Sequence, residues 1–585
     1  MGYPSIFISN QEFSSPDQNL FEMKSLKGLY FKFKKELIND LLIIENDTSF
    51  VFAHVNLALR NEIKNIKSDP EKLYSEFSFH IEKFHWGFIA FYNKKSNSLK
   101  CYNDPFGIYP LYLNKQEASF NISNDFDQLI DCLKEITFNK NALQDYFLFN
   151  YTLKSRTIFK EIKQFEGGML YSKKGDQFKF QKSYFIGSYI FRKNDGGLDE
   201  MTKSLTENIT SNLDLNKRMK IPLTGGFDTK VILSLAMENK ISFDTFTFGT
   251  PSSHDTIAAK KISKQLEIKN TFYNSYEYFE KNIDEALMTF LRAAPNAPIV
   301  HTLLQYQMMK THIKNHNIIT GKMGGELIVG PILLSQLITT KAAAILTKSD
   351  KRNLFREFEN VISDIGFLNT HSYVKNAPEY INSIESYNDI DGGNKRLIEF
   401  LVNETYAKFF GTVFSNIFAK SNMINPFMDL RFLRALFNSK YSITSKKVFS
   451  SSPFGHFQSR KLYPKLIQRS FPEILKSPMD RGYNLEDFLY WYKYPKPILN
   501  YVKRKIKGNT KTQELDYLSL LNDKLKGISK DSPLFKLDLI DTNKLDEMIK
   551  NLKNNNISNF HYQKLIQLFV LDLLAKKYAQ KIKFE

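Results

Sequence analysis

The chain has 585 residues, of which 42% are hydrophobic and 24% charged. This composition provides enough apolar sequence for large buried cores and argues against a disordered protein. The only two cysteines, Cys101 and Cys132, exclude a disulfide framework and a cysteine zinc cluster. The net charge of +19 comes largely from scattered lysines, so we expect a solvated basic surface and no nucleic-acid partner.

Neither end of the chain carries a recognisable membrane or export signal. The opening stretch MGYPSIFISNQEF lacks the basic region followed by an apolar region that a secretory signal requires. No apolar run reaches the roughly 20 residues of a membrane span, and LIQLFVLDLLA (565–575) contains Asp572 and predicts a buried helix. We therefore expect a cytoplasmic protein with no membrane partner.

Short β segments are predicted through residues 1–185. The stretch 84–114 alternates apolar and polar residues, breaks at 93–97 and turns again at Asn-Asp-Pro-Phe-Gly (103–107). A second hairpin is predicted around Lys-Gly-Asp (174–176). This half is predicted to be a β-sandwich with a few helices, and the polar stretch 191–200 is predicted to be the linker that follows it.

The pattern changes to alternating helices and strands after the linker. Helices are predicted at 198–213, 228–240 and 255–268, and strands at 219–223, 243–248, 270–274 and 315–321. Strands that alternate with helices at this spacing indicate a doubly wound parallel α/β sheet. From about residue 345 onward the pattern is mainly helical.

Two adjacent glycines stand between the first strand and helix of this second half, in Leu-Thr-Gly-Gly-Phe-Asp-Thr (223–229). This places them at the carboxyl end of a parallel strand, where open α/β sheets bind ligands. Glycines and the N–H groups of a helix start suit phosphate oxygens, Thr224 and Thr229 add hydroxyls, and Asp228 is expected to bind Mg²⁺. The alternative is a tight turn in which Asp228 and Thr229 only cap the helix. The sequence contains neither of the two commonest phosphate loops, G-x-x-x-x-G-K-[ST] and G-x-G-x-x-G.

The stretch LTGGFDT resembles the pyrophosphate-binding loop, S/T-G-G-x-D-S/T, of the asparagine synthetase family, which includes β-lactam synthetases and lasso-peptide cyclases. Further blocks resemble this family in the same order, among them residues 104–112, 145–171, 319–330 and 424–436. The resemblance implies two domains. Residues 1–190 would form a class II glutamine-amidotransferase-like domain with a β-sandwich of the N-terminal-nucleophile (Ntn) type. Residues 195–585 would form an ATP-pyrophosphatase-type synthetase domain with a helical C-terminal part.

The resemblance also implies a reaction. A carboxylate attacks the α-phosphate of ATP to give an acyl-adenylate and pyrophosphate, and an amine or ammonia then attacks the acyl carbon. The expected cofactors are ATP and Mg²⁺, with Asp228 as the metal ligand and Thr224, Gly225, Gly226 and Thr229 around the pyrophosphate. The expected adenine-binding residues are Leu223, Phe248, Thr320 and Gly321.

Four departures from the family pattern bear on activity. Gly2 stands where the amidotransferase nucleophile would be a cysteine, so glutamine hydrolysis by this chain is not expected and its N-terminal domain is expected to be degenerate. Lys322 occupies the position of the family's base and is expected to act as a phosphate clamp. The position of the second metal carboxylate holds Gly325, with Glu326 adjacent as a substitute. The lysine expected near R-x-K-x-G-F is displaced, and Arg481 could neutralise pyrophosphate there while Asp480 contacts an amine.

Three functions remain open from the sequence. The leading hypothesis is an ATP-dependent, AMP-forming amide ligase of the asparagine synthetase type that joins a small-molecule or peptide carboxylate to an amine or ammonia. The second is a specialised ligase or cyclase of natural-product or surface-polysaccharide biosynthesis. The third is a catalytically inactive scaffold. A homodimer is compatible with all three.

Overall fold

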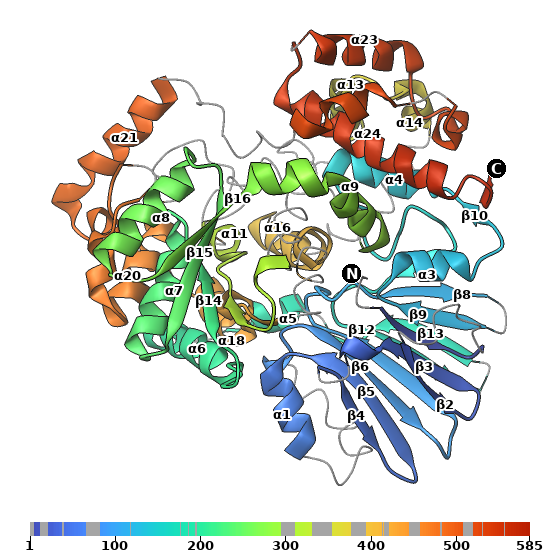
Figure 1. Cartoon of the computed structure of the whole chain (residues 1–585), viewed down its shortest axis with the longest axis horizontal. Coiled ribbons are helices and arrows are strands. Elements are labelled where there is room, and N and C mark those ends of the chain that lie inside the picture. Colours follow the sequence, from blue (N-terminus) through green and yellow to red (C-terminus); the bar gives the residue numbers. More distant parts are fainter. Residues whose placement is uncertain are drawn as a thin grey trace.

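A computed structural model of the chain describes most of the sequence. The residues described are 5–11, 21–37, 40–65, 82–116, 119–175, 177–184, 186–193, 196–293, 311–329, 354–375, 393–411, 414, 421–443, 457–479, 482–506, 519–528, 531–554 and 556–584. Figure 1 shows two regions with different architectures, a β-rich N-terminal part at the lower right and an α/β part at the left.

Two antiparallel six-stranded sheets form the N-terminal part. The first has the order β11 (Ile162–Gln164), β8 (Tyr112–Lys115), β9 (Phe120–Ser123), β1 (Ile6–Ser9), β3 (Leu29–Lys34) and β2 (Phe21–Leu26). The second has the order β13 (Gln177–Lys182), β12 (Met169–Lys174), β7 (Ser98–Asn103), β6 (Gly87–Asn93), β5 (Ser49–Val55) and β4 (Leu42–Glu45). Aromatic residues of the two inner faces pack together, with the rings of Phe31 and Phe50 4.8 Å apart. The predicted sandwich and both of its predicted hairpins are confirmed.

A five-stranded parallel sheet forms the centre of the second part. Its order is β16 (Asn270–Asn274), β15 (Phe243–Gly249), β14 (Met219–Pro222), β17 (Asn317–Ile319) and β18 (Asn422–Ile424). Its helices are α6 (Leu198–Ser211), α7 (Phe227–Glu238), α8 (His254–Gln265), α9 (Ser275–Ala293) and α11 (Gly324–Ile328). In Figure 1, α7 and α8 lie on the side of the sheet away from the N-terminal sandwich. The predicted parallel α/β sheet is confirmed, and β18 is a strand that the sequence pattern did not predict.

Helices dominate the rest of the described chain, as expected. They are α13 (Leu354–Ile365), α14 (Thr370–Lys375), α16 (Gly393–Phe400), the π-helix η7 (Leu401–Phe410), η8 (Pro426–Met428), α18 (Leu430–Phe437), α19 (Phe457–Arg460), α20 (Leu462–Arg469), η10 (Pro472–Lys476), η11 (Leu485–Phe488), η12 (Trp491–Lys493), α21 (Pro495–Ile506), α22 (Asn522–Lys526), η14 (Pro533–Leu537), α23 (Thr542–Lys553) and α24 (Asn559–Lys577). The N-terminal part adds η2 (Lys35–Leu37), α1 (Leu57–Asn65), α3 (Phe126–Asp131), α4 (Lys140–Phe149) and α5 (Ile186–Ile190). The predicted buried helix at 565–575 lies within α24. None of the helices in the described ranges combines the length and apolarity needed to cross a membrane.

Polar contacts hold the two parts together. The indole N–H of Trp86 donates to the carbonyl of Met423 on β18 at 3.2 Å. On η7, both carboxylate oxygens of Glu404 accept the N–H of Lys154 at 2.9 Å, and Lys408 donates to Gln164 Oε1 at 2.9 Å. The side chains of Glu404 and Lys408 are buried, so the contact between η7 and the N-terminal part is shielded from solvent.

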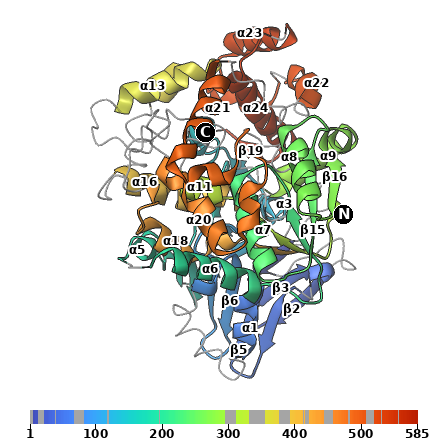
Figure 2. The ribbon, with the colours of Figure 1, turned by 90° about the vertical axis from the view of Figure 1, so that its left-hand side faces the viewer.

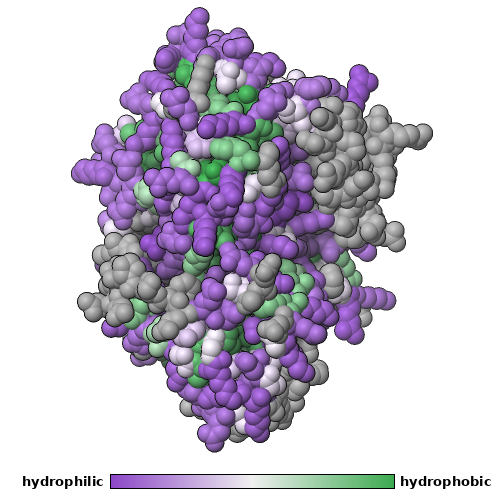
Figure 3. Space-filling view, turned by 90° about the vertical axis from the view of Figure 1, so that its right-hand side faces the viewer, coloured by the Kyte–Doolittle hydropathy of each residue, from purple (hydrophilic) through white to green (hydrophobic). Residues whose placement is uncertain are grey.

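The C-terminal end of the chain returns to the N-terminal part. A short strand, β19 (Ile582–Lys583), pairs in parallel with β10 (Ile136–Thr137). Helix α24 lies against α4, and Lys564 of α24 donates to Asn150 Oδ1 at 2.7 Å. Figure 1 shows α24 and the C-terminus beside α4 and β10. The face that includes this end of the chain is largely hydrophilic where it is coloured, with apolar atoms in small separate areas (Figure 3).

Candidate functional site

The loop between β14 and α7 is held in shape by its own polar groups. Gly225 donates its N–H to Asp255 Oδ1 on α8 at 2.9 Å. Gly226 donates its N–H to Thr224 Oγ1 at 3.2 Å, and the hydroxyls of Thr224 and Thr229 lie 3.0 Å apart. The two glycine N–H groups expected to face a phosphate are therefore already paired, which leaves the hydroxyls and the first turn of α7 as donors.

The start of α7 has no side-chain cap. Its N-cap residue is Gly226, which has no side chain to accept a hydrogen bond from the first-turn N–H groups. The alternative that Asp228 and Thr229 serve as caps is therefore not what the structure shows. A helix start without a side-chain cap presents its first-turn N–H groups and the positive end of the helix dipole, both of which attract an anion.

Asp228 lies at the centre of the site. Its Oδ1 accepts a hydrogen bond from the phenol of Tyr463 on α20 at 2.8 Å. The backbone after β17 approaches it so closely that a Cβ added at Gly324 would lie 2.4 Å from Oδ1, and one added at Gly321 would lie 2.8 Å from its Cβ. Burial, and then the negative charge of Glu326, raise the pKa of Asp228 to about 7. A cation at this point would lower the energy of both carboxylates.

Glu326 lies on α11, which follows β17. Burial raises the pKa of Glu326, and the charge of Lys322 lowers it. Lys322 is exposed, and its charge also acts to lower the pKa of Asp228. The structure thus brings together three predicted site residues, two acids and one base, from segments almost 100 positions apart.

The residue between Lys322 and α11 has an unusual backbone. Met323 has φ +74°, in the left-handed region, and its side chain is fully buried. Residues other than glycine seldom adopt this conformation, which costs of order 1–3 kcal/mol and is often found at binding sites. The strained residue brings the N-terminus of α11 against Asp228.

Lys230 lies beneath the glycine loop and is fully buried. Its ammonium donates to the carbonyl of Gly225 at 3.4 Å, to the carbonyl of Pro478 at 2.9 Å and to Met479 Sδ at 3.1 Å. Lys230 therefore connects the loop to the segment that leads into Asp480 and Arg481. Those two predicted residues lie outside the described part of the chain.

The expected adenine-binding residues lie at the carboxyl ends of the parallel strands. Leu223 is buried, donates its N–H to Phe246 O at 2.7 Å, and accepts from the hydroxyl of Thr247 at 2.9 Å. Thr320 donates its N–H to the carbonyl of Ile424 at 2.9 Å. Both the N–H and the carbonyl of Leu223 therefore already form hydrogen bonds with β15.

The other two residues of this set are less enclosed. The ring of Phe248 is half-buried and lies 5.3 Å from the ring of Tyr273. Gly321 is also half-buried and contacts Asp228. These two residues offer apolar surface and backbone at the edge of the site.

Three residues of this region were not found by sequence reasoning. Lys230 directly follows the loop motif, but the sequence does not show that its ammonium is buried. Tyr463 is 235 positions from Asp228, and no local pattern indicates that its phenol donates to this carboxylate. Tyr406, on η7, is fully buried, its hydroxyl has no hydrogen-bond partner in the described ranges, and the charge of Glu326 adds to the effect of burial in raising its pKa.

A site for a metal ion would have to rely on few protein ligands. Within the described ranges no group of three or more His, Cys, Asp or Glu side chains could hold a metal ion. Asp228 and Glu326 supply two carboxylates. Mg²⁺ is commonly bound by one or two carboxylates together with substrate phosphates and water, so this pair suits a metal that arrives with a nucleotide.

Comparisons with known proteins point to one family. Residues 44–185 match the glutamine amidotransferase domain; Gly2 lies outside this match and outside the described residues. The chain is 27% identical over 231 residues to "Asparagine synthetase [glutamine-hydrolyzing] 1" of Bacillus subtilis, a match that covers 37% of this chain and 36% of that protein. It is 21% identical over 287 residues to a "Putative asparagine synthetase [glutamine-hydrolyzing]" of Mycobacterium tuberculosis, covering 46% of this chain and 42% of that protein.

The matched regions thus span only about two fifths of the relatives' own lengths. Among solved structures, the allosteric regulatory enzyme of purine biosynthesis aligns with 47% of this chain and 75% of its own, at 8% identity and a TM-score of 0.21. The sequence matches show that the chain is similar to asparagine synthetases over less than half of its length, and that residues 44–185 form a glutamine-amidotransferase-like region.

Proposed function

We propose that the protein is an ATP-dependent amide-forming ligase that activates a carboxylate as an acyl-adenylate, releases pyrophosphate and transfers the acyl group to an amine or ammonia. The observation that carries the proposal is the position of Asp228. It lies in the first turn of α7, whose N-cap residue is a glycine, and it feels the charge of a second half-buried carboxylate, Glu326. The similarity to asparagine synthetases supports the same reaction class.

The residues present fit Mg²⁺ and ATP. Two neighbouring carboxylates whose pKa values are raised by burial are stabilised by a divalent cation. The glycines at 321 and 324 leave no space for a side chain against Asp228, so the backbone of this segment forms a wall of the site. When bound, the metal would supply positive charge for the pyrophosphate leaving group.

The chain's own residues would act by position and charge. The hydroxyls of Thr224 and Thr229 and the first turn of α7 would donate to pyrophosphate oxygens, and Lys322 would neutralise part of their charge. Asp255 and Lys230 would hold the loop from two sides through Gly225. Tyr463 would orient Asp228 by donating to its Oδ1, and the backbone of Gly325 would help to hold the same carboxylate in place beside a cation. Fixed donors of this kind lower the barrier because they need no reorganisation during the reaction.

The nature of the amine is the open part of the proposal. The exposed Lys322, at the position of the family's base, favours a specialised ligase or cyclase over asparagine synthesis. A lysine that stays charged beside phosphate is a poor general base, so the acceptor amine would have to arrive uncharged or lose its proton to another group. We propose that such a ligase depends on free ammonia or on a partner for its nitrogen.

The proposal is tested by measuring AMP and pyrophosphate release from Mg·ATP with ammonia and a panel of carboxylates. Asp228→Asn keeps the shape of the side chain and removes its charge. Asp523→Asn on α22, where the carboxylate is 93% exposed, is the matched control. Carboxylate-dependent AMP that is lost only in Asp228→Asn supports the ligase. ATP binding without AMP formation for any carboxylate would favour the inactive scaffold.

A further inference from the structure

Exposed apolar side chains gather at one place on the surface. Of the 12 large hydrophobic side chains that are exposed in the described ranges, five lie between residues 490 and 502. They are Tyr490, Trp491, Tyr492, Leu499 and Val502, which we call the aromatic patch. Trp491 is 79% exposed and Leu499 is 57% exposed. Single exposed apolar residues are common on proteins, but a contiguous group marks a contact surface.

Two elements build the aromatic patch. The single-turn helix η12 carries Trp491 and Tyr492, and the ring of Tyr490 stacks on that of Tyr492 at 5.6 Å. On α21, Leu499 and Val502 lie three positions apart, so they share one face of the helix. Asn500, on another face, donates to the carbonyl of Gly482 and fixes α21 to the body of the protein. The apolar face of α21 is therefore directed away from that attachment.

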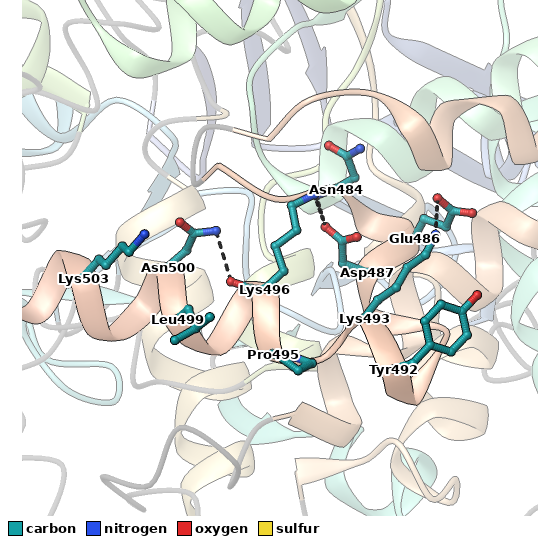
Figure 4. A pocket seen from close by; sticks show the side chains of 10 residues that line it. All are labelled: Asn484, Glu486, Asp487, Tyr492, Lys493, Pro495, Lys496, Leu499, Asn500 and Lys503. Carbon is teal, nitrogen blue, oxygen red and sulfur yellow. Dashed lines mark hydrogen bonds and ion pairs between the residues drawn. The ribbon is translucent and has the colours of Figure 1, made fainter.

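Lysines border the aromatic patch. Figure 4 shows the groove between η11, η12 and α21, with a volume of about 640 Å³, lined among others by Lys493, Lys496 and Lys503. Lys493 pairs with Glu486 and Lys496 with Asp487, each at 2.9 Å. The stretch 482–506 holds five lysines and arginines against two acidic residues. The region thus combines an apolar surface with a net positive charge.

The patch lies at the outer margin of the molecule. Figure 1 shows α21 at the left edge, beyond α8 and α20, and in Figure 2, turned by 90°, the same helix faces the viewer. Tyr492 and Leu499 line the groove, whereas Trp491 is 79% exposed and is not part of its lining. The apolar side chains therefore extend beyond the groove onto the outer surface.

We propose that the aromatic patch is a peripheral membrane contact that binds a bilayer surface containing anionic phospholipids. Tryptophan and tyrosine rings are favoured at the level of the lipid headgroups, and leucine and valine side chains gain by leaving water. The flanking lysines lie where they would meet lipid phosphates while their stems cover apolar surface. The protein would rest on the membrane through η12 and α21 and would not cross it.

A second copy of the chain fits this surface poorly. In a two-fold symmetric contact the same patch meets itself, so the lysines at the groove would face their own copies in a protein whose net charge is already +19. Like charges at an interface oppose association. An anionic bilayer supplies the opposite charge over a wide area.

The chain offers a direct probe for this proposal. It contains two tryptophans. Trp86 is buried between the two parts of the molecule, whereas Trp491 is in the patch. The experiment adds phosphatidylcholine vesicles, with and without about 30 mol % phosphatidylglycerol, to the full chain and follows tryptophan emission and co-sedimentation. We expect co-sedimentation and a blue shift with the anionic vesicles only, both weakened by salt, and no blue shift for Trp491→Phe.

Matched variants locate the contact. Leu499→Asn combined with Val502→Asn changes only exposed positions, and we expect vesicle affinity to fall by about tenfold or more. The control Leu215→Asn alters a side chain that is 89% exposed elsewhere and should bind as the wild type does. The proposal is overturned if anionic vesicles do not bind, if they bind the patch and control variants equally, or if the emission of Trp491 does not shift. It is also overturned if vesicles do not bind and the patch variants instead abolish a dimer or the binding of polyglutamate. The patch would then contact a second copy of the chain or an acidic polypeptide.

Discussion

At the scale of single residues, the site depends on hydrogen bonds between side chains of the β14–α7 region and residues of other segments of the chain. Tyr463 donates a hydrogen bond to Asp228. In the glycine loop, Gly225 donates its N–H to Asp255 and accepts a hydrogen bond from Lys230 at its carbonyl. These contacts fix the loop before any ligand arrives. A rigid loop presents its donors without the entropic cost of ordering them on binding.

Lys230 offers the clearest single-residue test of this view. Replacing Lys230 with methionine keeps the apolar stem but removes the donor to the carbonyls of Gly225 and Pro478. Each buried acceptor left without a donor costs about 1–3 kcal/mol, so we expect the free energy of unfolding in urea to fall by about 2–5 kcal/mol. Lys260→Met, at an exposed position of α8, should change it by less than about 0.5 kcal/mol. Equal stability of the two variants would contradict the account.

At the scale of elements, the strand–helix units that carry the site were predictable, and the elements that support it were not. Strands β14, β15 and β16 and helices α7 and α8 appear within a few residues of their predicted bounds, because each shows a clear apolar period and a turn signal. The three-residue strand β18 shows no such period. The π-helix η7 is defined by its contacts with the N-terminal part through Glu404 and Lys408, which no local pattern reveals.

Helix α24 gives a pH-dependent test of its contact with α4. Burial lowers the pKa of Lys564 to about 7, whereas in the unfolded chain it titrates near 10.4. Between these values the unfolded chain binds one proton more than the folded chain, so stability should rise with pH from about 7 to about 10. The contribution approaches about 1.4 kcal/mol per pH unit.

The measurement compares urea unfolding at several pH values for the wild type and Lys564→Met. The variant should lose this pH-dependent gain, and Lys553→Met, at an exposed position of α23, should retain it. Parallel pH profiles for the wild type and Lys564→Met would show that Lys564 keeps an ordinary pKa in the folded protein.

At the scale of the whole molecule, the sequence predicted two regions of different architecture but not how firmly they are joined. We propose a domain boundary near residues 190–195. Across it, Trp86 bonds to β18, η7 bonds to Lys154 and Gln164, and the C-terminal β19 pairs with β10. These contacts join residues hundreds of positions apart, and apolar periodicity carries no information about such pairings.

The joined parts should therefore unfold together. Residues 195–585 expressed alone would expose the buried polar side chains of η7 and the surface of α24 that faces α4. We expect this fragment to aggregate or to bind a hydrophobic dye, and the full chain to show one unfolding transition by both fluorescence and circular dichroism. A folded, soluble fragment with an unfolding midpoint equal to that of the full chain would contradict this view of the interface.

The most direct test of the account is pyrophosphate release from Mg·ATP in the presence of a carboxylate panel and ammonia, comparing the wild type with Asp228→Asn and Asp523→Asn. The account predicts release that requires one class of carboxylate and that falls by at least about a hundredfold in Asp228→Asn, a typical loss when a key charge in a site is removed. Asp523→Asn should match the wild type. Pyrophosphate release that is unchanged in Asp228→Asn would contradict the central role given to Asp228. If the wild type releases no pyrophosphate, equal ATP affinities of the wild type and Asp228→Asn would contradict it as well.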